Sequence, residues 1–484
     1  MNTDARHPRG IYTLFFTEMW ERMSYYGMRT LLVLFMVDQV RGGMGLTDEM
    51  AAAIYGLYTA SVYLAALPGG WIGDRLLGAK RSVWWGGVVI ALGHLVLGIS
   101  DARAFFTGLV LIALGSGLLK SNMSTLVGQL YPEGGARRDA GFTLFYMGIN
   151  VGAFAGPLLC GYLGEKIGWH WGFAAAAAGM MLGLLQFYLT KRHLAGIGER
   201  PTHEGQNYPR DVAIMLGGIG VIGFIVVLCV TGVVTVNAPW LAQRSAYVLA
   251  AVAALFFTWA FGLAGLSTAE KKRVAVIVVL FLASVIFWAG FEQIGSSFTL
   301  FAERFTLRRF FGGEIPTGWF QSVNPVLVIL LAPVVAMLWA RLARKNIEPS
   351  LTKKLAWAQL LLASGFVVIS FGAQRALEAG TVWPTWLLTV SLLHTLGELF
   401  LSPVGLSAVT KLSPPRLTGQ MMGVWFLGSS LGNLSAGLFA GEVSGEATAQ
   451  MPERFLIVAA VSGSAGFLLW LSARWIQKLM PGIK

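Results

Sequence analysis

The sequence has few charged residues and only two cysteines. Asp, Glu, Lys and Arg make up 12% of the 484 residues, whereas 55% are hydrophobic. So little charge cannot cover that much apolar surface in one water-soluble core. Cys160 and Cys229 both fall inside apolar segments, so we expect two buried free thiols and no disulfide framework. The composition predicts an integral membrane protein.

The marks of an enzyme are also missing from the sequence. We find no nucleophile beside a base, no phosphate-binding loop and no cluster of metal ligands, and the six histidines are scattered. We therefore expect a protein that is not an enzyme, holds no metal and needs no cofactor.

Positive charge follows the loops of the chain. The formal net charge is +12, but Lys and Arg gather on alternate connections, as in the run Lys271 to Arg273, and are sparse on the others. This is the positive-inside pattern for an even number of spans with both ends in the cytoplasm. It predicts a multi-pass protein of the cell (inner) membrane, with both termini cytoplasmic and no nucleic-acid partner.

Apolar segments recur along the whole chain. Fourteen are long enough to cross about 30 Å of hydrocarbon. The predicted spans are residues 11–37, 51–76, 83–100, 104–130, 141–164, 169–190, 212–235, 245–266, 274–301, 318–341, 354–373, 383–410, 417–441 and 454–475.

A faint internal repeat divides these spans. Gly148 and Gly152 match Gly428 and Gly432 at an offset of 280, as in transporters built from two related halves. Six helices need only about 200 residues, so this offset leaves room for two inserted helices, which we expect to lie outside the substrate path. The predicted domains are an N-terminal six-helix bundle at 1–190, a linker with two extra transmembrane helices at 191–273, and a C-terminal six-helix bundle at 274–484.

The first span carries a polar face. At 100° per residue, five side chains fall inside about 100° of arc. They are Glu18, Glu21, Arg22, Tyr25 and Arg29. A purely structural ion-pair network stays open, but in lipid it would gain little, because desolvation roughly cancels the attraction. We interpret the face as part of a working site.

Other spans contain Lys120, Glu292 and Glu398. A charge near the bilayer centre costs about 3 kcal/mol and usually faces a cavity or another charge. The spans then hold four carboxylates and three cations, so one acid is expected to carry a proton near neutral pH. Cations in the first half, and Glu398 with Asn324 in the second, suit a zwitterion. Aromatic rings such as Tyr63 are candidates to line the space between its ends.

Several motifs together resemble the proton-dependent oligopeptide transporters of the major facilitator superfamily. The segment from Glu18 to Gly27 matches the family's first signature, except at Met23, where the family usually has phenylalanine. Residues 69–81 resemble the superfamily's loop between helices two and three, and residues 145–152 resemble a second signature. The resemblance covers nearly the whole chain. It implies an all-α major facilitator fold with fourteen transmembrane helices, two six-helix halves plus two inserted helices.

The resemblance also implies a function, a proton-coupled symporter that imports di- and tripeptides by alternating access, with protons as the coupling ion. The implied proton-coupling residues are Glu18, Glu21, Arg22 and Glu292. The implied contacts are Tyr25, Arg29 and Lys120 for the peptide's carboxyl end, Asn150, Asn324 and Glu398 for its amino end, and Trp425 at the pocket wall. The implied gate comprises Arg29, Glu292 and Lys120.

Two alternatives stay open. The same fold could carry nitrate or another small anion, as plant relatives of the family do, although an anion alone leaves Glu398 without a function. A gated channel is less consistent with an internal repeat and with mixed charges facing one cavity. We expect the protein to act as a monomer in the lipid bilayer.

Overall fold

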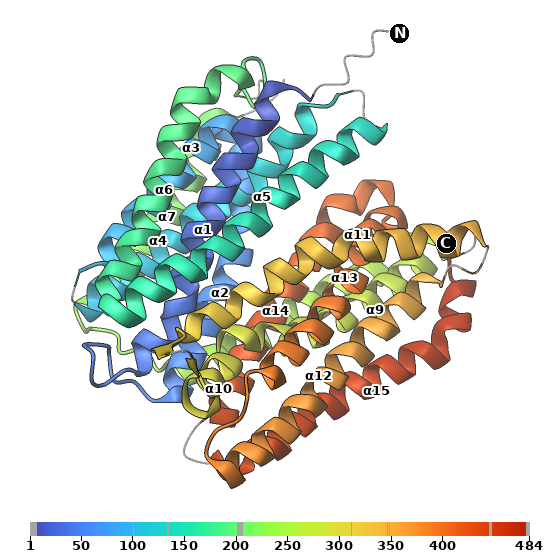
Figure 1. The fold of residues 1–484 in the computed structure, drawn as a ribbon. Helices are drawn as coiled ribbons and strands as arrows, with labels where there is room; N and C mark the ends of the chain where they lie inside the picture. The colour runs from blue at the N-terminus through green and yellow to red at the C-terminus, as the bar shows by residue number, and fades with distance from the viewer. Residues whose placement is uncertain are drawn as a thin grey trace. The chain divides into compact units, whose positions relative to one another are not determined.

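The computed structural model describes residues 7–99, 101–132, 135–200, 207–310, 312–345, 347, 349–444 and 448–480. The predicted cytoplasmic ends, residues 1–6 and 481–484, lie outside this part. The long helices (Figure 1) are α1 (Arg9–Val37), α2 (Asp48–Ile72), α3 (Ala79–Leu97), α4 (Ala102–Gln129), α5 (Gly135–Tyr162), α6 (Trp169–Thr190), α7 (Tyr208–Val230), α8 (Ala238–Gly262), α9 (Thr268–Phe291), α11 (Val323–Arg344), α12 (Leu351–Ala379), α13 (Thr385–Leu412), α14 (Thr418–Ser444) and α15 (Met451–Lys478).

Each predicted span overlaps one of these long helices. Within the described residues, eleven helical segments are long and apolar enough to cross a membrane. Helices α1, α3 and α14 are not among the eleven. The polar face predicted for the first span lies on α1, whose charged side chains lower its mean hydropathy.

The chain forms two compact units. Unit 1 comprises Met1–Phe35, Gln39–Met44 and Ser61–Asn237, and unit 2 comprises Met36–Asp38, Gly45–Ala60 and Ala238–Lys484. Helix α2 belongs to unit 2 as far as Ala60 and to unit 1 from Ser61 onward. The domain boundaries at 190 and 273 stay predictions.

Glycines bring α2 and α4 into backbone contact inside unit 1. A Cβ atom on Gly69 would lie 2.3 Å from the carbonyl oxygen of Gly117. The Asn122 side chain donates from Nδ2 to the Gly69 carbonyl at 3.1 Å. Small residues at such interfaces let helices in a membrane pack closely. Helix α2 then continues as a π-helical turn, Gly73–Leu77, and Gly78, with φ at 78°, turns the chain into α3.

The span predicted at residues 274–301 as one helix is broken in the structure. Helix α9 ends at Phe291, a 3₁₀ turn covers Glu292–Gly295, and a short helix α10 (Ser297–Phe305) follows. At the break, a Cβ atom on Gly295 would lie 1.8 Å from the Tyr55 hydroxyl, so the tyrosine packs directly on the backbone. The predicted span itself is confirmed, because residues Thr268–Phe305 together form one candidate membrane span. The break inside it was not predicted, because the contact with Tyr55 is remote in sequence.

The described residues include a small β-hairpin between two helical segments. Strand β1 (Arg309–Phe310) pairs antiparallel with β2 (Gly313–Glu314) between α10 and α11. Neither strand was predicted, because two-residue strands leave no periodic signal in the sequence.

The two inserted helices are weakly packed within their own units. The apolar part of α7 has no buried residues, and that of α8 is 17% buried. Cys160 on α5 is buried and free as predicted, whereas Cys229 on α7 is free but only half-buried. The prediction of a buried thiol is therefore wrong for Cys229, because its helix has few neighbours.

Candidate functional site

The polar face of α1, a helix of unit 1, is buried. The exposed fractions are 2% for Glu18, 0% for Glu21, 5% for Arg22, 5% for Tyr25 and 6% for Arg29. The helical period places these side chains on one side, and the burial shows that this side faces protein. The sequence prediction of one polar face on the first span is consistent with this arrangement.

Arg22 joins the two carboxylates of this face. Its Nε atom donates to Glu18 Oε1 at 2.7 Å, one helical turn away, and lies 3.0 Å from Glu21 Oε2. Within the described part of the chain, both Glu21 oxygens and Glu18 Oε2 lack a hydrogen-bond partner. One guanidinium group therefore serves two buried acids, and Glu21 is held mainly by charge.

Lys120 on α4 acts on one of these acids. It acts electrostatically on Glu21, and its Nζ atom lies 4.0 Å from the centroid of the half-buried Tyr63 ring. A cation over an aromatic face is stabilised by the ring quadrupole. The structure thus brings Lys120 close to both Tyr63 and Glu21, and their roles toward a substrate stay predictions.

Aromatic rings flank the cations of α1. The Arg22 guanidinium lies 6.0 Å from the Tyr25 ring centroid, and the Arg29 guanidinium lies 5.6 Å from the Tyr26 ring centroid. The two tyrosine rings meet edge to face at 5.2 Å. This packing limits the rotamers of both arginines.

A second polar cluster lies in unit 2. Asn324 on α11 donates from Nδ2 to Glu398 Oε2 at 3.0 Å and to Thr395 Oγ1 at 2.9 Å, both on α13. Glu292, at the break after α9, is buried and acts electrostatically on Glu398. Three of the predicted residues, from two helices and the turn after α9, therefore meet here.

Two predicted substrate contacts have local partners. Asn150 is buried on α5, and its Nδ2 atom donates to the Tyr146 carbonyl of the same helix at 2.9 Å. Trp425 is buried on α14, and its indole ring packs on Gly405, where a Cβ atom would lie 2.4 Å away. Their roles toward a peptide stay predictions.

Sequence reasoning did not single out some polar partners. Thr395 lies one turn before Glu398 on α13, a spacing that could have marked it. His394 is buried among the rings of Phe291, Phe298 and Phe366. These aromatic neighbours come from distant segments, so the sequence around His394 does not predict the contacts.

The two clusters have similar chemistry. Each holds carboxylates that are buried or partly buried beside amide, hydroxyl or cationic donors. In the part of the chain that the structure describes, no three His, Cys, Asp or Glu side chains gather as a metal site requires. The predicted salt bridge between Arg29 and Glu292 would join unit 1 to unit 2 and stays a prediction.

The chain is similar in sequence to a family of known proteins and to several of its members. A family model described as "POT family" matches residues 80–453. The chain is 46% identical over 465 residues to a peptide transporter of Yersinia enterocolitica, YePEPT. The aligned region covers 93% of this chain and 90% of the relative. It is 32% identical over 492 residues to a di-/tripeptide transporter of Lactococcus lactis subsp. cremoris, covering 99% and 97%.

Solved structures are similar over almost the full length. The crystal structure of a peptide transporter POT in complex with sulfate matches with a TM-score of 0.91 and 36% identity, covering 98% of this chain and 96% of that chain. A POT family transporter in complex with 5-aminolevulinic acid matches with a TM-score of 0.88 and 30% identity, covering 97% of both.

Proposed function

The chain belongs to the POT family, and on this premise we propose that it is a proton-coupled symporter that imports di- and tripeptides by alternating access. It is a multi-pass membrane protein with the major facilitator fold, two six-helix halves plus two inserted helices. The named relatives that transport peptides support the choice of substrate.

One observation supports proton coupling above the others. Arg22 contacts both Glu18 and Glu21 inside a buried helix face. With one guanidinium group shared by two acids, a proton can replace the cation as the partner of either carboxylate. A proton taken up at Glu21 would free Arg22 and Lys120 from that acid.

The proposed cycle uses this exchange. Two halves rock about a central site, and protonation of Glu292, or of the Glu18 and Glu21 pair, breaks an ion pair so that one side opens. Arg29, Glu292 and Lys120 are the proposed gate. Removal of the proton on the other side would restore the pair and release the peptide.

The polar groups suit the two ends of a peptide. In unit 1, Lys120, Arg29 and Tyr25 offer positive charge and a phenol to a carboxylate. In unit 2, Glu398 with Asn324 offers negative charge and an amide to an ammonium group. Recognition of both ends rather than of side chains would admit many sequences while limiting length.

Uptake of labelled dialanine into proteoliposomes tests the proposal. With an inward proton gradient, uptake should exceed that in liposomes without a gradient and should fall when an ionophore dissipates the gradient. Uptake that does not depend on the gradient would contradict proton coupling. Absence of any dialanine uptake would contradict the assignment of short peptides as the substrate.

A substitution separates coupling from binding. Glu21→Gln keeps the shape of the side chain but cannot exchange a proton, so gradient-driven uptake should be lost while exchange of labelled for unlabelled dialanine continues. Ser24→Ala, on the same helix, is the control and should retain both activities. Equal loss of uptake and exchange in Glu21→Gln would contradict its assignment to proton coupling.

The remaining assignments follow from the same proposal. We place the protein in the cell inner membrane with both termini in the cytoplasm, acting as a monomeric transporter and not as an enzyme. Competition of dialanine uptake by dipeptides, but not by nitrate, would separate a peptide carrier from an anion carrier, for which Glu398 has no function.

A further inference from the structure

An open groove lies at one end of unit 2, outside the clusters described above. It has a volume of about 880 Å³ and lies between the end of α11, the start of α12 and the end of α15. Volumes of roughly 300–1,000 Å³ are typical of sites for small ligands. The groove is therefore large enough for the polar part of a lipid or a similar molecule.

The lining of the groove is positively charged. Lys353 at the start of α12, and Arg474 and Lys478 at the end of α15, are exposed side chains that line it. None of the described lining residues is Asp or Glu, and none of these three cations has an ion-pair partner within the described part of the chain. Neighbouring Lys354 instead lies over the Trp339 ring, at 4.9 Å.

Helix ends reinforce this charge. Ser350 precedes α12 and lines the groove, and its side chain makes no capping bond to the first turn. The unbonded N–H groups of a helix N-terminus attract anions. Three cations and a helix N-terminus converge on one open space, a combination that suits a phosphate group.

Two tryptophans give the groove an orientation. Trp357 follows Lys353 by one turn on α12, and Trp470 precedes Arg474 by one turn on α15, so the Cα atoms of each pair lie about 6 Å apart along the helix axis. Each ring is about half exposed, at 49% and 50%. Tryptophans one turn inside a basic helix end are typical of the membrane interface, with cations on the water side.

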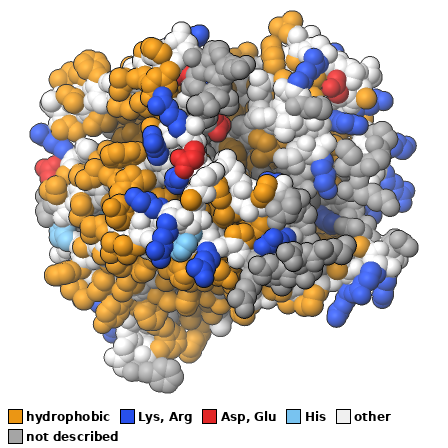
Figure 2. All heavy atoms as spheres, turned by 90° about the horizontal axis from the view of Figure 1, so that it is seen from above, with side chains coloured by type: hydrophobic (Ala, Val, Ile, Leu, Met, Phe, Trp, Pro, Cys, Tyr) orange, Lys and Arg blue, Asp and Glu red, His pale blue; other side chains and the backbone are white. Residues whose placement is uncertain are grey.

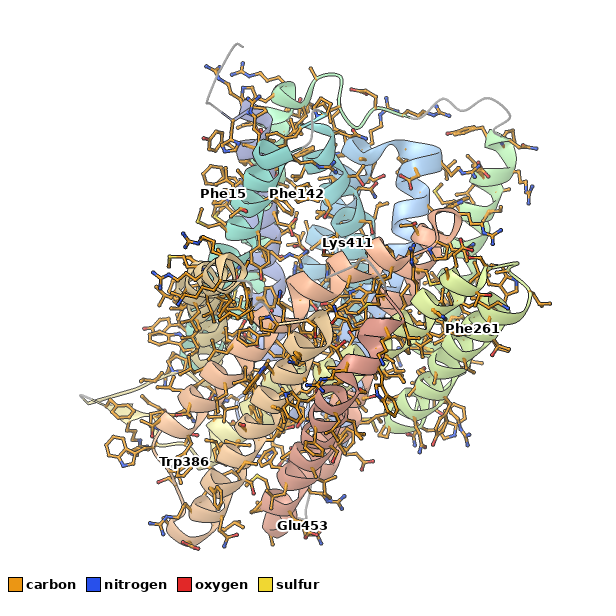
Figure 3. The ribbon with its side chains drawn as sticks, turned by 90° about the vertical axis from the view of Figure 1, so that its right-hand side faces the viewer. Phe15, Phe142, Phe261, Trp386, Lys411 and Glu453 are labelled. Atoms are coloured by element: carbon orange, nitrogen blue, oxygen red, sulfur yellow. The ribbon has the colours of Figure 1, made fainter. Side chains whose placement is uncertain are left out.

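The same end of the helices is predicted to face the cytoplasm. Figure 3 places Trp386 and Glu453, near the starts of α13 and α15, at the lower end of unit 2, and Lys411, near the end of α13, higher up. Seen from above, the molecule carries many Lys and Arg side chains and few Asp and Glu (Figure 2). Anionic lipids of the cytoplasmic leaflet attract such basic clusters.

We propose that the groove between α11, α12 and α15 binds the headgroup of an anionic phospholipid from the cytoplasmic leaflet. Lys353, Arg474 and Lys478 contact its phosphate group, and Trp357 and Trp470 pack against the glycerol and the upper acyl chains. The site is separate from the Glu398 cluster, so a lipid there stabilises the α12 and α15 pair without occupying the peptide path.

Native mass spectrometry of the full-length protein in detergent micelles tests this. The protein is mixed with equal amounts of phosphatidylglycerol and phosphatidylethanolamine with identical palmitoyl-oleoyl chains, and the ratio of the two bound lipids is measured. Each single change of Lys353, Arg474 or Lys478 to Gln should lower the ratio of bound phosphatidylglycerol to bound phosphatidylethanolamine about fivefold. This corresponds to a loss of about 1 kcal/mol of binding free energy per cation.

The matched control removes the same charge elsewhere in unit 2. The triple variant Lys271→Gln, Lys272→Gln, Lys411→Gln should keep the wild-type ratio, whereas the triple groove variant should bring the ratio close to one. Exchange of Arg474 for Lys should retain the preference, because the charge remains. These measurements need no transport, so they are independent of the proposed function.

Three results would overturn the proposal. The triple groove variant could retain the preference for phosphatidylglycerol. The control triple could lose it equally, which would indicate general surface charge. Finally, millimolar glycerol 3-phosphate or inorganic phosphate could displace the lipid, which would assign the groove to a soluble phosphate compound.

Discussion

Removing the shared cation of α1 should destabilise the protein far more than removing one of its acids. Arg22→Gln leaves the carboxylates of Glu18 and Glu21 buried, at 2% and 0% exposure, with Lys120 acting on Glu21. One cation then remains for two acids. Glu18→Gln instead leaves Arg22 with Glu21 at 3.0 Å and with an amide oxygen in place of the carboxylate.

The sizes of the two effects follow from these contacts. Breaking a buried ion pair by removing one partner costs about 3–5 kcal/mol, because a charge stays behind. Replacing a charge-assisted hydrogen bond by a neutral one costs only about 1 kcal/mol. The double variant Glu18→Gln, Arg22→Gln should be more stable than Arg22→Gln alone, since it strands one charge fewer.

Reversible unfolding measures these differences. The purified protein in dodecylmaltoside is titrated with sodium dodecyl sulfate, and helix content is followed by circular dichroism. Ser24→Ala is the control for any loss of a buried polar contact on α1, because Ser24 Oγ bonds His94 Nε2 at 2.7 Å. Ser24→Ala should lower the free energy of unfolding by about 1–2 kcal/mol.

The order of the variants decides the outcome. A double variant as unstable as the sum of the two single variants would refute a cluster in which two acids share one cation. So would an Arg22→Gln variant no less stable than Glu18→Gln.

Three further changes test other contacts. Asn324→Leu removes the donor at 3.0 Å from Glu398 and should raise the KM for dialanine about 10-fold or more, because hydrogen bonds to charged groups contribute about 1.5–3 kcal/mol. Gly73→Ala places a Cβ atom 1.8 Å from Asn122 Oδ1, so the yield of folded protein from detergent extraction should fall. Ser267→Ala removes the capping box at the start of α9 and should lower the free energy of unfolding by about 1 kcal/mol.

Matched control variants accompany the first two changes. The Thr395 hydroxyl also accepts a hydrogen bond from Asn324 but carries no charge. Thr395→Val should therefore change the KM for dialanine less than Asn324→Leu does. Gly217→Ala, where no atom lies within 4 Å, should leave the yield unchanged. Equal effects in either comparison, or a Ser267→Ala variant as stable as the parent, would contradict the contacts described.

Local periodicity explains what the sequence could predict of the site. Glu18 and Arg22 are four residues apart on one helix, so helical geometry alone brings them together. Most of the fourteen spans were likewise predictable, because an apolar run of about 20 residues has few alternatives in a chain with so little charge, and eleven helical segments in the described residues meet that criterion.

Contacts between distant segments explain what the sequence could not predict. Asn324 and Glu398 were each noticed as polar residues in apolar spans, but their hydrogen bond needs the packing of α11 on α13. Thr395 escaped attention because a hydroxyl in an apolar helix costs little when it bonds its own backbone, as it does to the Ser391 carbonyl.

The contact between Tyr55 and Gly295 has an evolutionary consequence. Because a Cβ atom at position 295 would lie 1.8 Å from the phenol oxygen, the two positions cannot accept large side chains together. Across relatives, they should therefore co-vary, with any residue larger than glycine at 295 accompanied by a smaller ring or none at 55. A lineage can then gain a side chain at position 295 only after the tyrosine at position 55 has been replaced by a smaller residue.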